Sequence, residues 1–400
     1  MKFGYILHLA KWYPNREDDL EGIFIKRHLE CISENHRSVV LYLRPSNRIL
    51  KHRWYELEIF HNEQFSEWIG YYNKHVTGIK VLDKILKFFY YYCLSYKLFK
   101  EIVRQNGLPD FILVHVMLRT ALFAKWVLLT KNIPYAIVEH HTLYLNLHFG
   151  FIEKLKNFIR KYVVTSANGI ITVSHQLEQA MKKHGLSNKH YYQVFNAVDT
   201  AIFYPKLKQN RSQYYLLHVS EFIDHHKNIT GLLQAFKNAQ EKSPSLRLIL
   251  VGYGQDFPKV NRTINQLGIS QLVTLIPKTT GSGLADLFRN ADLFVLFSHK
   301  ENMPCVLAES LCCGTPFISS DVGGIREIAD KDYTVLVPAG NIDALVHHIV
   351  EFAKYPFVHD PFSISKDANE RFSNTAVAKK WDQVIQLLFP TAILKDSQLL

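Results

Sequence analysis

Two glutamates eight positions apart, Glu301 and Glu309, enclose a stretch whose residue types suit phosphate binding. The stretch follows the apolar run 293–297, which is typical of a buried strand, and contains the helix-start residues Asn302 and Pro304. A helix that begins at the carboxyl end of a parallel strand directs its free N–H groups and its partial positive charge into a crevice. The sequence therefore predicts an anion site flanked by carboxylates.

The N–H groups of this predicted helix start would bind the phosphate oxygens. Proline has no N–H, so the expected donors are Met303, Cys305 and Val306. A diphosphate with a sugar at each end suits the arrangement, because carboxylates accept hydrogen bonds from sugar hydroxyls. The competing interpretation is an ordinary helix surface that carries two glutamates.

The surrounding sequence resembles the retaining GT-B glycosyltransferases of family 4. Members of that family carry a pair of glutamates separated by seven residues, and the stretch 320–328 is similar to the strand and glycine loop that follow the pair. The segment 196–199, with Phe203 and Pro205, resembles the family's interdomain segment. The resemblance is strongest over 216–345. It implies an α/β fold of two Rossmann-like domains that face each other across a cleft, with a carboxyl-terminal helix that returns to the first domain.

Length and composition agree with two domains. A chain of 400 residues with 48% hydrophobic content is too long for one typical core. Apolar runs alternate with amphipathic stretches, as in β-α-β units. Together with the resemblance, these features predict an acceptor-binding domain over 1–205, a nucleotide-sugar-binding domain over 206–372 and a closing helix over 373–390.

The resemblance implies a role for each charged residue of the predicted site. Glu309 would accept hydrogen bonds from ribose hydroxyls, and Glu301 would contact the hexose or stabilise positive charge at its anomeric carbon. Lys227 would stabilise the negative charge that grows on the β-phosphate of the leaving nucleotide. The reaction retains the anomeric configuration, and neither glutamate needs to act as a nucleophile.

One position departs from the family pattern. Family members usually supply an arginine together with this lysine, and the corresponding residue here is Glu221. Either Lys227 and the helix N–H groups bind the phosphates alone, or a nearby cation supplies a second charge. The candidates for that second charge are His225, His226 and Arg326.

Further candidate residues fall at turns and strand ends. Gly22 resembles the glycine of a loop over the donor diphosphate, although a turn with positive φ explains one glycine equally well. Gly252 begins a turn that resembles the family's Val-Gly-x-Gly and is predicted to contact the donor. His140 matches the family histidine beside the transferred sugar, and His115 matches a more variable position. For both histidines the alternative is a packed, hydrogen-bonded residue at a strand end.

Positive charge is concentrated in the first half of the chain. Residues 1–205 contain 27 Lys and Arg against 17 Asp and Glu, whereas 206–400 contain 20 against 19. This imbalance indicates an anionic partner for the first half, either a phospholipid surface or a phosphorylated acceptor, with plain solubility as the alternative. Nucleic acid is not expected, because zinc-finger spacing, an RNP-like motif and a basic heptad region are missing from the sequence.

Two basic stretches of this half, 83–105 and 151–162, have the amphipathic pattern of helices that bind membrane surfaces. Packing into a protein core is the other explanation, which we favour for 83–105 and weigh equally for 151–162. Residues 1–10 are too short and polar for a signal peptide, and no run approaches 18 apolar residues. We therefore expect a cytoplasmic protein that lies peripherally on the inner face of the membrane.

No metal or cofactor is expected, since the nucleotide sugar is a substrate. The five cysteines show no C-x-x-C spacing, so neither a disulfide framework nor a zinc site is indicated. Asp330 and Asp332 have D-x-D spacing but are assigned to a solvated turn.

Together these features predict the transfer of a hexose-type sugar from a UDP- or GDP-linked donor to a glycan or lipid-linked saccharide, in surface polysaccharide biosynthesis. The alternatives are a nucleotide-sugar epimerase or hydrolase on the same fold and a catalytically silent sugar-nucleotide-binding subunit.

Overall fold

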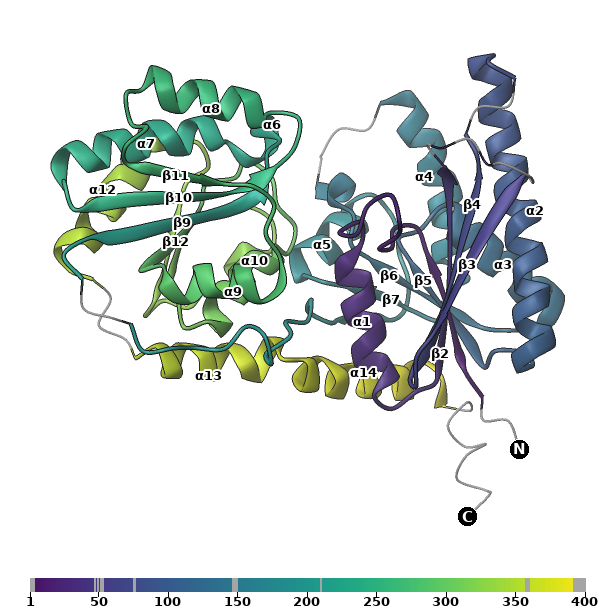
Figure 1. The fold of residues 1–400 in the computed structure, drawn as a ribbon. Coiled ribbons are helices and arrows are strands. Elements are labelled where there is room, and N and C mark those ends of the chain that lie inside the picture. Colours follow the sequence, from purple (N-terminus) through teal and green to yellow (C-terminus); the bar gives the residue numbers. More distant parts are fainter. Residues whose placement is uncertain are drawn as a thin grey trace. The chain divides into compact units, whose positions relative to one another are not determined.

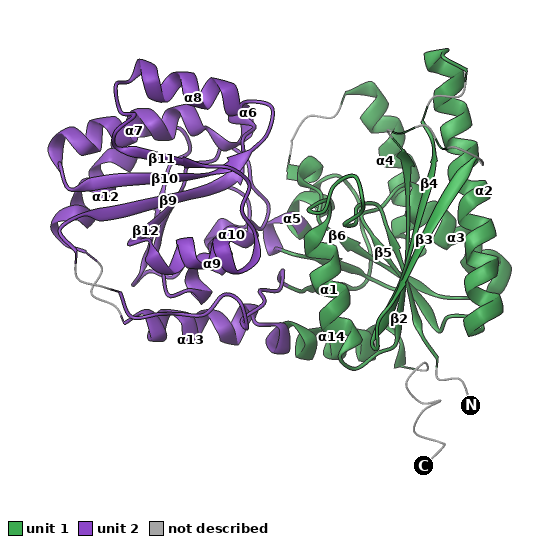
Figure 2. Ribbon diagram, viewed as in Figure 1, with its two compact units in different colours: residues 1–173, 178–194, 377–400 green, residues 174–177, 195–376 purple. Residues whose placement is uncertain are grey.

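The structure is a computed structural model that describes residues 4–46, 48, 50, 54–74, 77–145, 150–208, 211–356 and 360–390. The chain divides into two compact units, drawn in green and purple in Figure 2. Unit 1 comprises residues 1–173, 178–194 and 377–400, and unit 2 comprises 174–177 and 195–376. Each unit consists of helices around one sheet (Figure 1), as the alternation of apolar runs and amphipathic stretches predicts.

Unit 1 is built on an eight-stranded sheet with the order β3-β4-β2-β1-β5-β6-β7-β8. Only β3 runs antiparallel to its neighbour, at the edge of the sheet. The central strands β1 and β5 are buried along their whole length, as expected for parallel strands covered by helices on both faces. The strands are β1 Ile6–Ala10, β2 Ser38–Ser46, β3 Tyr55–His61, β4 Phe65–Asn73, β5 Phe111–His115, β6 Tyr135–Glu139, β7 Ile170–Thr172 and β8 Tyr191–Gln193.

The last helix of the chain contributes to the core of unit 1. From Val377 onward α14 belongs to this unit, and the indole N–H of Trp381 donates to Nδ1 of His28 at 2.9 Å. Just after α14, the ring of Phe389 stacks on Phe111 with 3.9 Å between ring centroids. The helices with residues in this unit are α1 Ile23–Ser33, α2 Lys80–Asn106, α3 Arg119–Lys131, the 3-10 helix η1 Thr142–Leu145, α4 Phe151–Val164, α5 His175–Lys183 and α14 Asn374–Leu388.

Unit 2 contains a six-stranded, fully parallel sheet with the order β11-β10-β9-β12-β13-β14. Its strands are β9 Tyr214–Glu221, β10 Leu246–Tyr253, β11 Val273–Ile276, β12 Leu293–Leu296, β13 Phe317–Ser320 and β14 Thr334–Val337. The helices pack on this sheet through apolar stripes; in α7 the stripe of Ile229, Leu232, Leu233 and Phe236 is fully buried. The helices are α6 Asp224–Lys227, α7 Ile229–Lys242, α8 Phe257–Gln266, α9 Gly281–Asn290, α10 Cys305–Cys312, α11 Ile325–Ile328, α12 Ile342–Lys354 and α13 Pro361–Phe372.

The predicted domain boundary at 205/206 lies eleven residues after the division between the two compact units. The units divide at 194/195, and the short segment 174–177 also belongs to unit 2. The reason is local packing: the side-chain amide of Asn196 donates to the carbonyl of Met303 at 3.0 Å, and Val198 forms a β-bridge with Ser373. Residues 195–205 are therefore part of unit 2, although the charged composition that follows them is typical of a linker.

The two amphipathic stretches form α2 and α4, and neither is a simple core helix. The carboxyl-terminal half of α2 buries one face, which includes Leu94, Leu98 and Ile102, but its amino-terminal half exposes large apolar side chains. The favoured core interpretation therefore holds for only part of the helix. In α4 the pattern is inverted, because Phe151 is 84% and Phe158 is 74% exposed, whereas Arg160 is buried and paired with Glu153. No helix in the described residues is long and apolar enough to cross a bilayer.

Candidate functional site

The strand order of unit 2 reverses between β9 and β12, and the candidate donor site lies at the carboxyl ends of these strands. In open α/β sheets such a reversal leaves a crevice in which ligands bind. The segment after β9 forms α6, and the segment after β12 leads into α10. The N–H of His299 donates to the carbonyl of His226 at 2.7 Å, which joins the two segments. Lys227 and Glu301 thereby meet although 74 positions separate them.

Lys227 and Glu301 form an ion pair, with 2.5 Å between Nζ and Oε1. The hydroxyl of Ser298 donates to the same carboxylate oxygen at 2.7 Å. The Glu301 side chain is 8% exposed and that of Lys227 is 23% exposed, so the carboxylate is held by two donors in a largely dry position. Within the described residues the second carboxylate oxygen has no hydrogen-bond partner, which leaves it available to a sugar hydroxyl.

Helix α10 begins at Cys305, with Pro304 as its N-cap residue. In the part of the chain that the structure describes, nothing accepts a hydrogen bond from the backbone N–H of Met303 or of Val306. Glu309 follows one turn into the helix and is buried. The structure thus brings the predicted N–H donors and this carboxylate to one helix start.

The glycine loop after β13 supports the backbone that carries Glu301. Gly323 has φ of 59°, and a Cβ on it would lie 2.0 Å from the carbonyl oxygen of Glu301. The N–H of Gly324 donates to the carbonyl of Asn302 at 2.7 Å, and the side-chain oxygen of Asn302 accepts from the hydroxyl of Ser174 at 3.0 Å. The two glycines are needed because a side chain would push this turn away from the loop.

The expected sources of a second positive charge differ in their surroundings. Arg326 is exposed and forms an ion pair with Asp321. Burial, followed by repulsion from neighbouring cations, lowers the pKa of the His226 imidazole, which favours its neutral form. Lys300, which sequence reasoning missed, is exposed and directly precedes Glu301 in the chain. Its backbone N–H donates to the carbonyl of His226 at 3.3 Å. Its position directly before Glu301 was the available signal.

Gly252 and Gly22 both lie where a side chain would not fit. A Cβ on Gly252, in β10, would lie 2.3 Å from the Phe222 ring. Gly22 is the N-cap residue of α1 with φ of 65°, and a Cβ there would lie 2.5 Å from the carbonyl carbon of Trp12. Local packing and backbone conformation therefore account for both glycines, and donor contact remains a prediction.

His140 lies in unit 1, directly after β6, and is buried among aromatic and imidazole rings. Its ring centroid is 4.7 Å from that of Phe24 and 5.3 Å from that of His28. Burial, with a smaller contribution from His28, holds the pKa of His140 well below its ordinary value, so the imidazole is neutral near pH 7. His115 is fully buried, with Nε2 3.0 Å from Nδ1 of His8, and fits the alternative of a packed histidine.

Glu139, a buried carboxylate that sequence reasoning did not single out, fixes the turn that carries His140. Its side-chain oxygens accept hydrogen bonds from the backbone N–H groups of His140 at 2.9 Å, His141 at 2.8 Å and Met117 at 3.2 Å. Burial raises the pKa of Glu139, and these N–H donors oppose the rise. The available signal was an acid at the end of an otherwise apolar strand.

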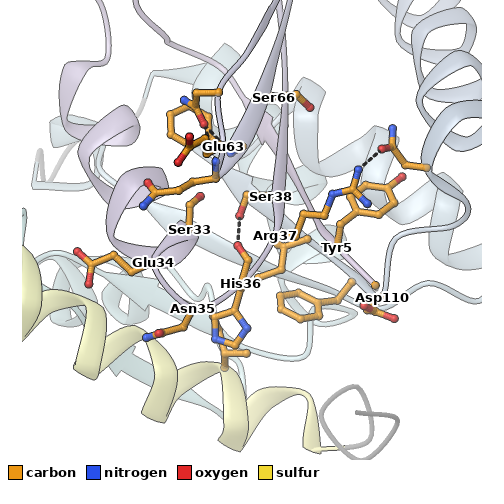
Figure 3. Close-up of a pocket in the computed structure, with 18 of the residues that line it drawn as sticks. Tyr5, Ser33, Glu34, Asn35, His36, Arg37, Ser38, Glu63, Ser66 and Asp110 are labelled. Carbon is orange, nitrogen blue, oxygen red and sulfur yellow. Dashed lines mark hydrogen bonds between the residues drawn. The ribbon is translucent and has the colours of Figure 1, made fainter. Parts of the chain in front are cut away.

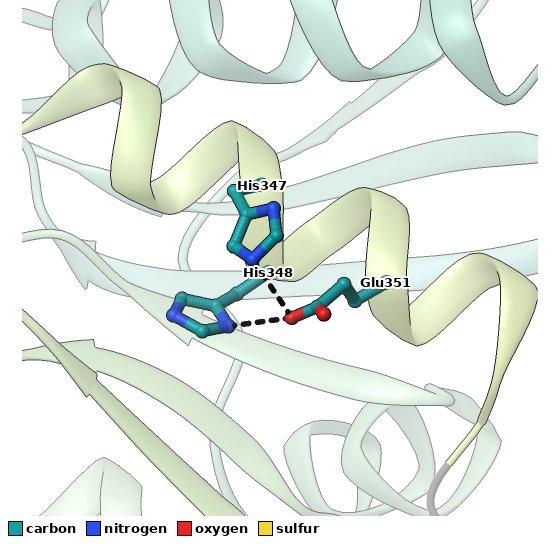
Figure 4. A group of neighbouring side chains, drawn as sticks. All are labelled: His347, His348 and Glu351. Atoms are coloured by element: carbon teal, nitrogen blue, oxygen red, sulfur yellow. Dashed lines mark hydrogen bonds and ion pairs between the residues drawn. The ribbon is translucent and has the colours of Figure 1, made fainter.

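One group of potential metal ligands lies within the described residues, on α12 (Figure 4). His347 and His348 each contact a carboxylate oxygen of Glu351, at 3.2 and 3.1 Å. These contacts account for the grouping without an ion. Asp330 and Asp332 lie at a turn in which the N–H of Asp332 donates to the Asp330 side chain at 2.9 Å.

Two family profiles match the chain. The profile described as "Glycosyltransferase Family 4" matches residues 28–202, and "Glycosyl transferases group 1" matches residues 199–371. A curated relative, the N-acetyl-alpha-D-glucosaminyl L-malate synthase of Bacillus anthracis, is 27% identical over 219 residues, which cover 52% of this chain and 56% of the relative. A D-inositol 3-phosphate glycosyltransferase of Mycobacteroides abscessus is 28% identical over 181 residues, covering 42% of this chain and 40% of the relative. The chain thus spans about half the length of these relatives.

Solved structures share the fold over almost the whole chain. A sucrose-phosphate synthase from Thermosynechococcus elongatus superposes with a TM-score of 0.73 at 18% identity, covering 97% of this chain and 99% of the other. Anabaena HepE in complex with UDP gives 0.70 at 15% identity, with coverage of 96% and 99%. Since the two profiles together extend over residues 28–371 and the fold agrees with these structures, the chain belongs to the family 4 glycosyltransferases of the GT-B fold.

Proposed function

We propose that the protein is a retaining glycosyltransferase that moves a hexose-type sugar from a UDP- or GDP-linked donor to an acceptor. The observation that carries the proposal is the Lys227–Glu301 ion pair at the strand reversal that also holds the start of α10. A cation, helix N–H groups and a buried carboxylate are the groups that a nucleotide diphosphate and its sugar require. Structures of Anabaena HepE with UDP and with UDP-glucose support the class of donor.

The leaving diphosphate is the part of the donor that most needs stabilisation. When the bond between the anomeric carbon and the β-phosphate oxygen breaks, negative charge grows on that phosphate, and in the proposal Lys227 stabilises it. The acceptor hydroxyl attacks from the face that the phosphate leaves, and its proton passes to a phosphate oxygen. This scheme needs neither a metal ion nor a covalent bond to Glu301.

The remaining site residues take supporting roles in the proposal. Glu309 accepts hydrogen bonds from the ribose hydroxyls, and the free oxygen of Glu301 accepts one from the hexose. His140 keeps the role that the family resemblance implies, beside the transferred sugar, where its neutral imidazole offers one donor and one acceptor. Gly22 and Gly252 let the backbone approach the donor closely.

We propose that the acceptor is a glycan or a lipid-linked saccharide of a surface polysaccharide, used by a protein that lies peripherally on the inner face of the membrane. The basic first half and the exposed apolar faces of α2 and α4 support a membrane surface as partner. The named activities of the curated relatives, which include transfer to L-malate and to inositol 3-phosphate, support an anionic acceptor.

The proposal is tested by incubating the protein with a panel of UDP- and GDP-sugars, identifying the retained ligand by mass spectrometry, and then measuring transfer with and without EDTA. Sugar transfer with retained anomeric configuration is expected, at the same rate in EDTA. Loss of all turnover on chelation would contradict the metal-free scheme.

The same assay separates the alternatives. An epimerase or hydrolase changes the donor when no acceptor is present. A silent binding subunit binds the nucleotide sugar, and the variants Lys227→Ala and Glu309→Gln do not. It shows no turnover with any acceptor tested. Lys242→Ala is the matched control for the lysine variant, since Lys242 lies exposed at the far end of α7.

A further inference from the structure

Unit 1 contains a cavity of about 670 Å³ at the carboxyl edge of its sheet. Its lining comes from the ends of β2 and β4 and from the segments that follow β1 and β5, including the point where the strand order reverses. Ligands of open α/β sheets bind at such an edge. All residues that line the cavity belong to unit 1.

One wall of the cavity is strongly basic. The single lining acid is Glu21, and the lining cations are Lys11, Arg44, Lys74, Arg119 and Lys156. Arg44 is already paired with Glu21 at 2.8 Å, and Lys156 is paired with Glu153 at 2.7 Å. In contrast, Arg119 and Lys11 form no ion pair within the described residues.

Arg119 and Lys11 are held by aromatic side chains instead of carboxylates. A guanidinium N–H of Arg119 donates to the Tyr72 hydroxyl at 3.4 Å, and the guanidinium lies 5.4 Å from the Tyr91 ring centroid. The ammonium of Lys11 lies 4.5 Å from the Trp12 ring centroid. Burial is the main cause that lowers the pKa of Lys11, and the attraction of the Glu139 carboxylate opposes this shift. A cation at a ligand edge that forms no ion pair within the described residues, as Arg119 does not, indicates an anionic ligand.

Backbone strain marks the same wall. Val116 and Leu118, which connect β5 to α3, have φ of 63° and 105°. Each costs about 1–3 kcal/mol in a non-glycine residue, and such conformations cluster at ligand sites. They place Arg119 as the first residue of α3, whose amino terminus adds a partial positive charge at the cavity.

The other wall of the cavity is apolar and continues onto the surface. It is formed by Phe88 and Tyr91 of α2, Leu122 of α3 and Ile159 of α4. Phe88 is itself 54% exposed. The same helices expose further large apolar side chains, which are Val81, Leu82, Ile85, Phe89 and Tyr96 on α2 and Phe151, Ile152, Leu155, Phe158 and Tyr162 on α4.

We infer that this cavity binds the phosphate or diphosphate group of a lipid-linked acceptor, with Arg119 and Lys11 at the phosphate and the hydrocarbon chain leaving along α2 and α4 toward a bilayer surface. The inference rests on the proposed transferase function, of which it names the acceptor class. A soluble sugar phosphate would use the cations but would leave the apolar wall and the exposed rings of α2 and α4 without a role.

A second cavity in the same unit lacks this combination. It has about 770 Å³ and lies at the opposite, amino edge of the sheet (Figure 3). Its polar groups already pair with one another: His36 contacts Asp382 at 2.9 Å, and Arg37 donates to Asn106 at 2.7 Å. Size alone does not identify a ligand site here; unpaired charge at the ligand edge does.

The test uses the full chain and farnesyl diphosphate, below its micelle concentration, with inorganic diphosphate and farnesol as the two partial ligands. We expect binding of farnesyl diphosphate, at least tenfold weaker binding of either partial ligand, and a loss of about tenfold or more in Arg119→Ala. Lys131→Ala is the matched control, because Lys131 is an exposed cation at the other end of α3. Its affinity should equal that of the wild type.

Each outcome decides the inference. Equal affinity for inorganic diphosphate and farnesyl diphosphate would overturn the lipid part in favour of a free phosphate site, and equal affinity in Arg119→Ala and the wild type would overturn the site. Lys227→Ala should bind farnesyl diphosphate normally, and Arg119→Ala should bind the nucleotide sugar normally. Transfer to a soluble glycan without any binding of farnesyl diphosphate would refute this inference and leave the proposed function standing. Binding of farnesyl diphosphate without any sugar transfer would refute the proposed function and leave the binding site standing.

Discussion

Both units place their candidate sites at the carboxyl edge of a parallel sheet where the strand order reverses, but the two edges are chemically different. In unit 2 the cation Lys227 is paired with the buried carboxylate of Glu301. In unit 1 Arg119 and Lys11 rest against aromatic rings, beside buried neutral histidines. The candidate donor site is thus organised by an ion pair within the protein, whereas Arg119 in unit 1 forms no ion pair within the described residues.

The largest expected effect comes from breaking the pair in unit 2. Lys227→Ala removes the cation at the leaving phosphate and leaves Glu301 as a buried charge without its partner. We expect kcat to fall by about 10²–10³, the range for removal of one preorganised donor of a developing negative charge. Single-turnover kinetics measures the chemical step directly, and Lys242→Ala controls for the loss of one positive charge.

Arg119→Ala in unit 1 should raise the KM for the acceptor with a smaller effect on the chemical step, since Arg119 contacts no part of the donor in the proposal. If Lys227→Ala and Arg119→Ala lowered kcat equally, the distinction between a paired donor site and an unpaired acceptor site would be wrong.

The two units should also differ in how their stability depends on pH. His8, His115 and His140 are buried in unit 1, and burial is the main cause that lowers the pKa of each, that of His8 to about 3. In unit 2, burial lowers the pKa of His218 to about 4. A histidine that is neutral when folded binds its proton in the unfolded chain below about pH 6.5, so stability is full above that pH and is lost as the pH falls. Each such group removes about 1.4 kcal/mol per pH unit.

Unit 1 should therefore lose protection before unit 2 when the pH is lowered from 7.5 to 5.5. Hydrogen exchange, followed by peptide mapping at both pH values, reports the two units separately. Greater loss of protection in β9 and β12 than in β1 and β5 would show that the buried histidines of unit 1 do not dominate.

The third prediction concerns the close contact of Gly323 with the backbone of Glu301 in unit 2. Gly323→Ala would place a Cβ 2.0 Å from the Glu301 carbonyl oxygen in addition to requiring φ of 59°. We expect a loss of about 3 kcal/mol in the free energy of unfolding, together with lower activity, because the turn that carries Glu301 must shift. Gly268→Ala is the matched control, since Gly268 has φ of 69° and open space around it, and it should cost about 1 kcal/mol. Urea unfolding of the two variants measures the difference.

The arrangement of the candidate donor site was largely predictable from sequence because it depends on local residue patterns. Pro304, Glu309 and the apolar run before them predict a strand followed by a helix start, and the structure has that arrangement. The partner of Glu301 required the resemblance, since Lys227 is 74 positions away and only the strand order joins them. The glycine loop was recognised as a pattern, but its physical role, close approach to the carbonyl of Glu301, depends on tertiary contact.

The site of unit 1 was much less predictable. The hydrogen bonds of Glu139 to two separate turns, and the positive φ of Val116 and Leu118, depend on how neighbouring strands end. The orientation of α4 shows the same limit. Its amphipathic period predicts one apolar face but not which face is buried, and burial of Arg160 against Glu153 turns that face outward.

The smallest expected effect tests this outward face of α4. If Phe158 inserts into the bilayer interface, Phe158→Ser should weaken binding to anionic vesicles about fivefold, since a partly inserted ring contributes a fraction of its full burial energy. Leu387→Ser on α14 removes another exposed apolar side chain, which does not belong to α2 or α4, and should leave vesicle binding unchanged. Sedimentation across a salt series separates the two contributions, because salt weakens the attraction of the lysines to anionic lipid and leaves the apolar part intact. If the wild type binds vesicles about fivefold more tightly than Phe158→Ser at every salt concentration, Phe158 is an inserted side chain. Equal binding of Phe158→Ser and Leu387→Ser would assign the membrane contact of unit 1 to charge alone.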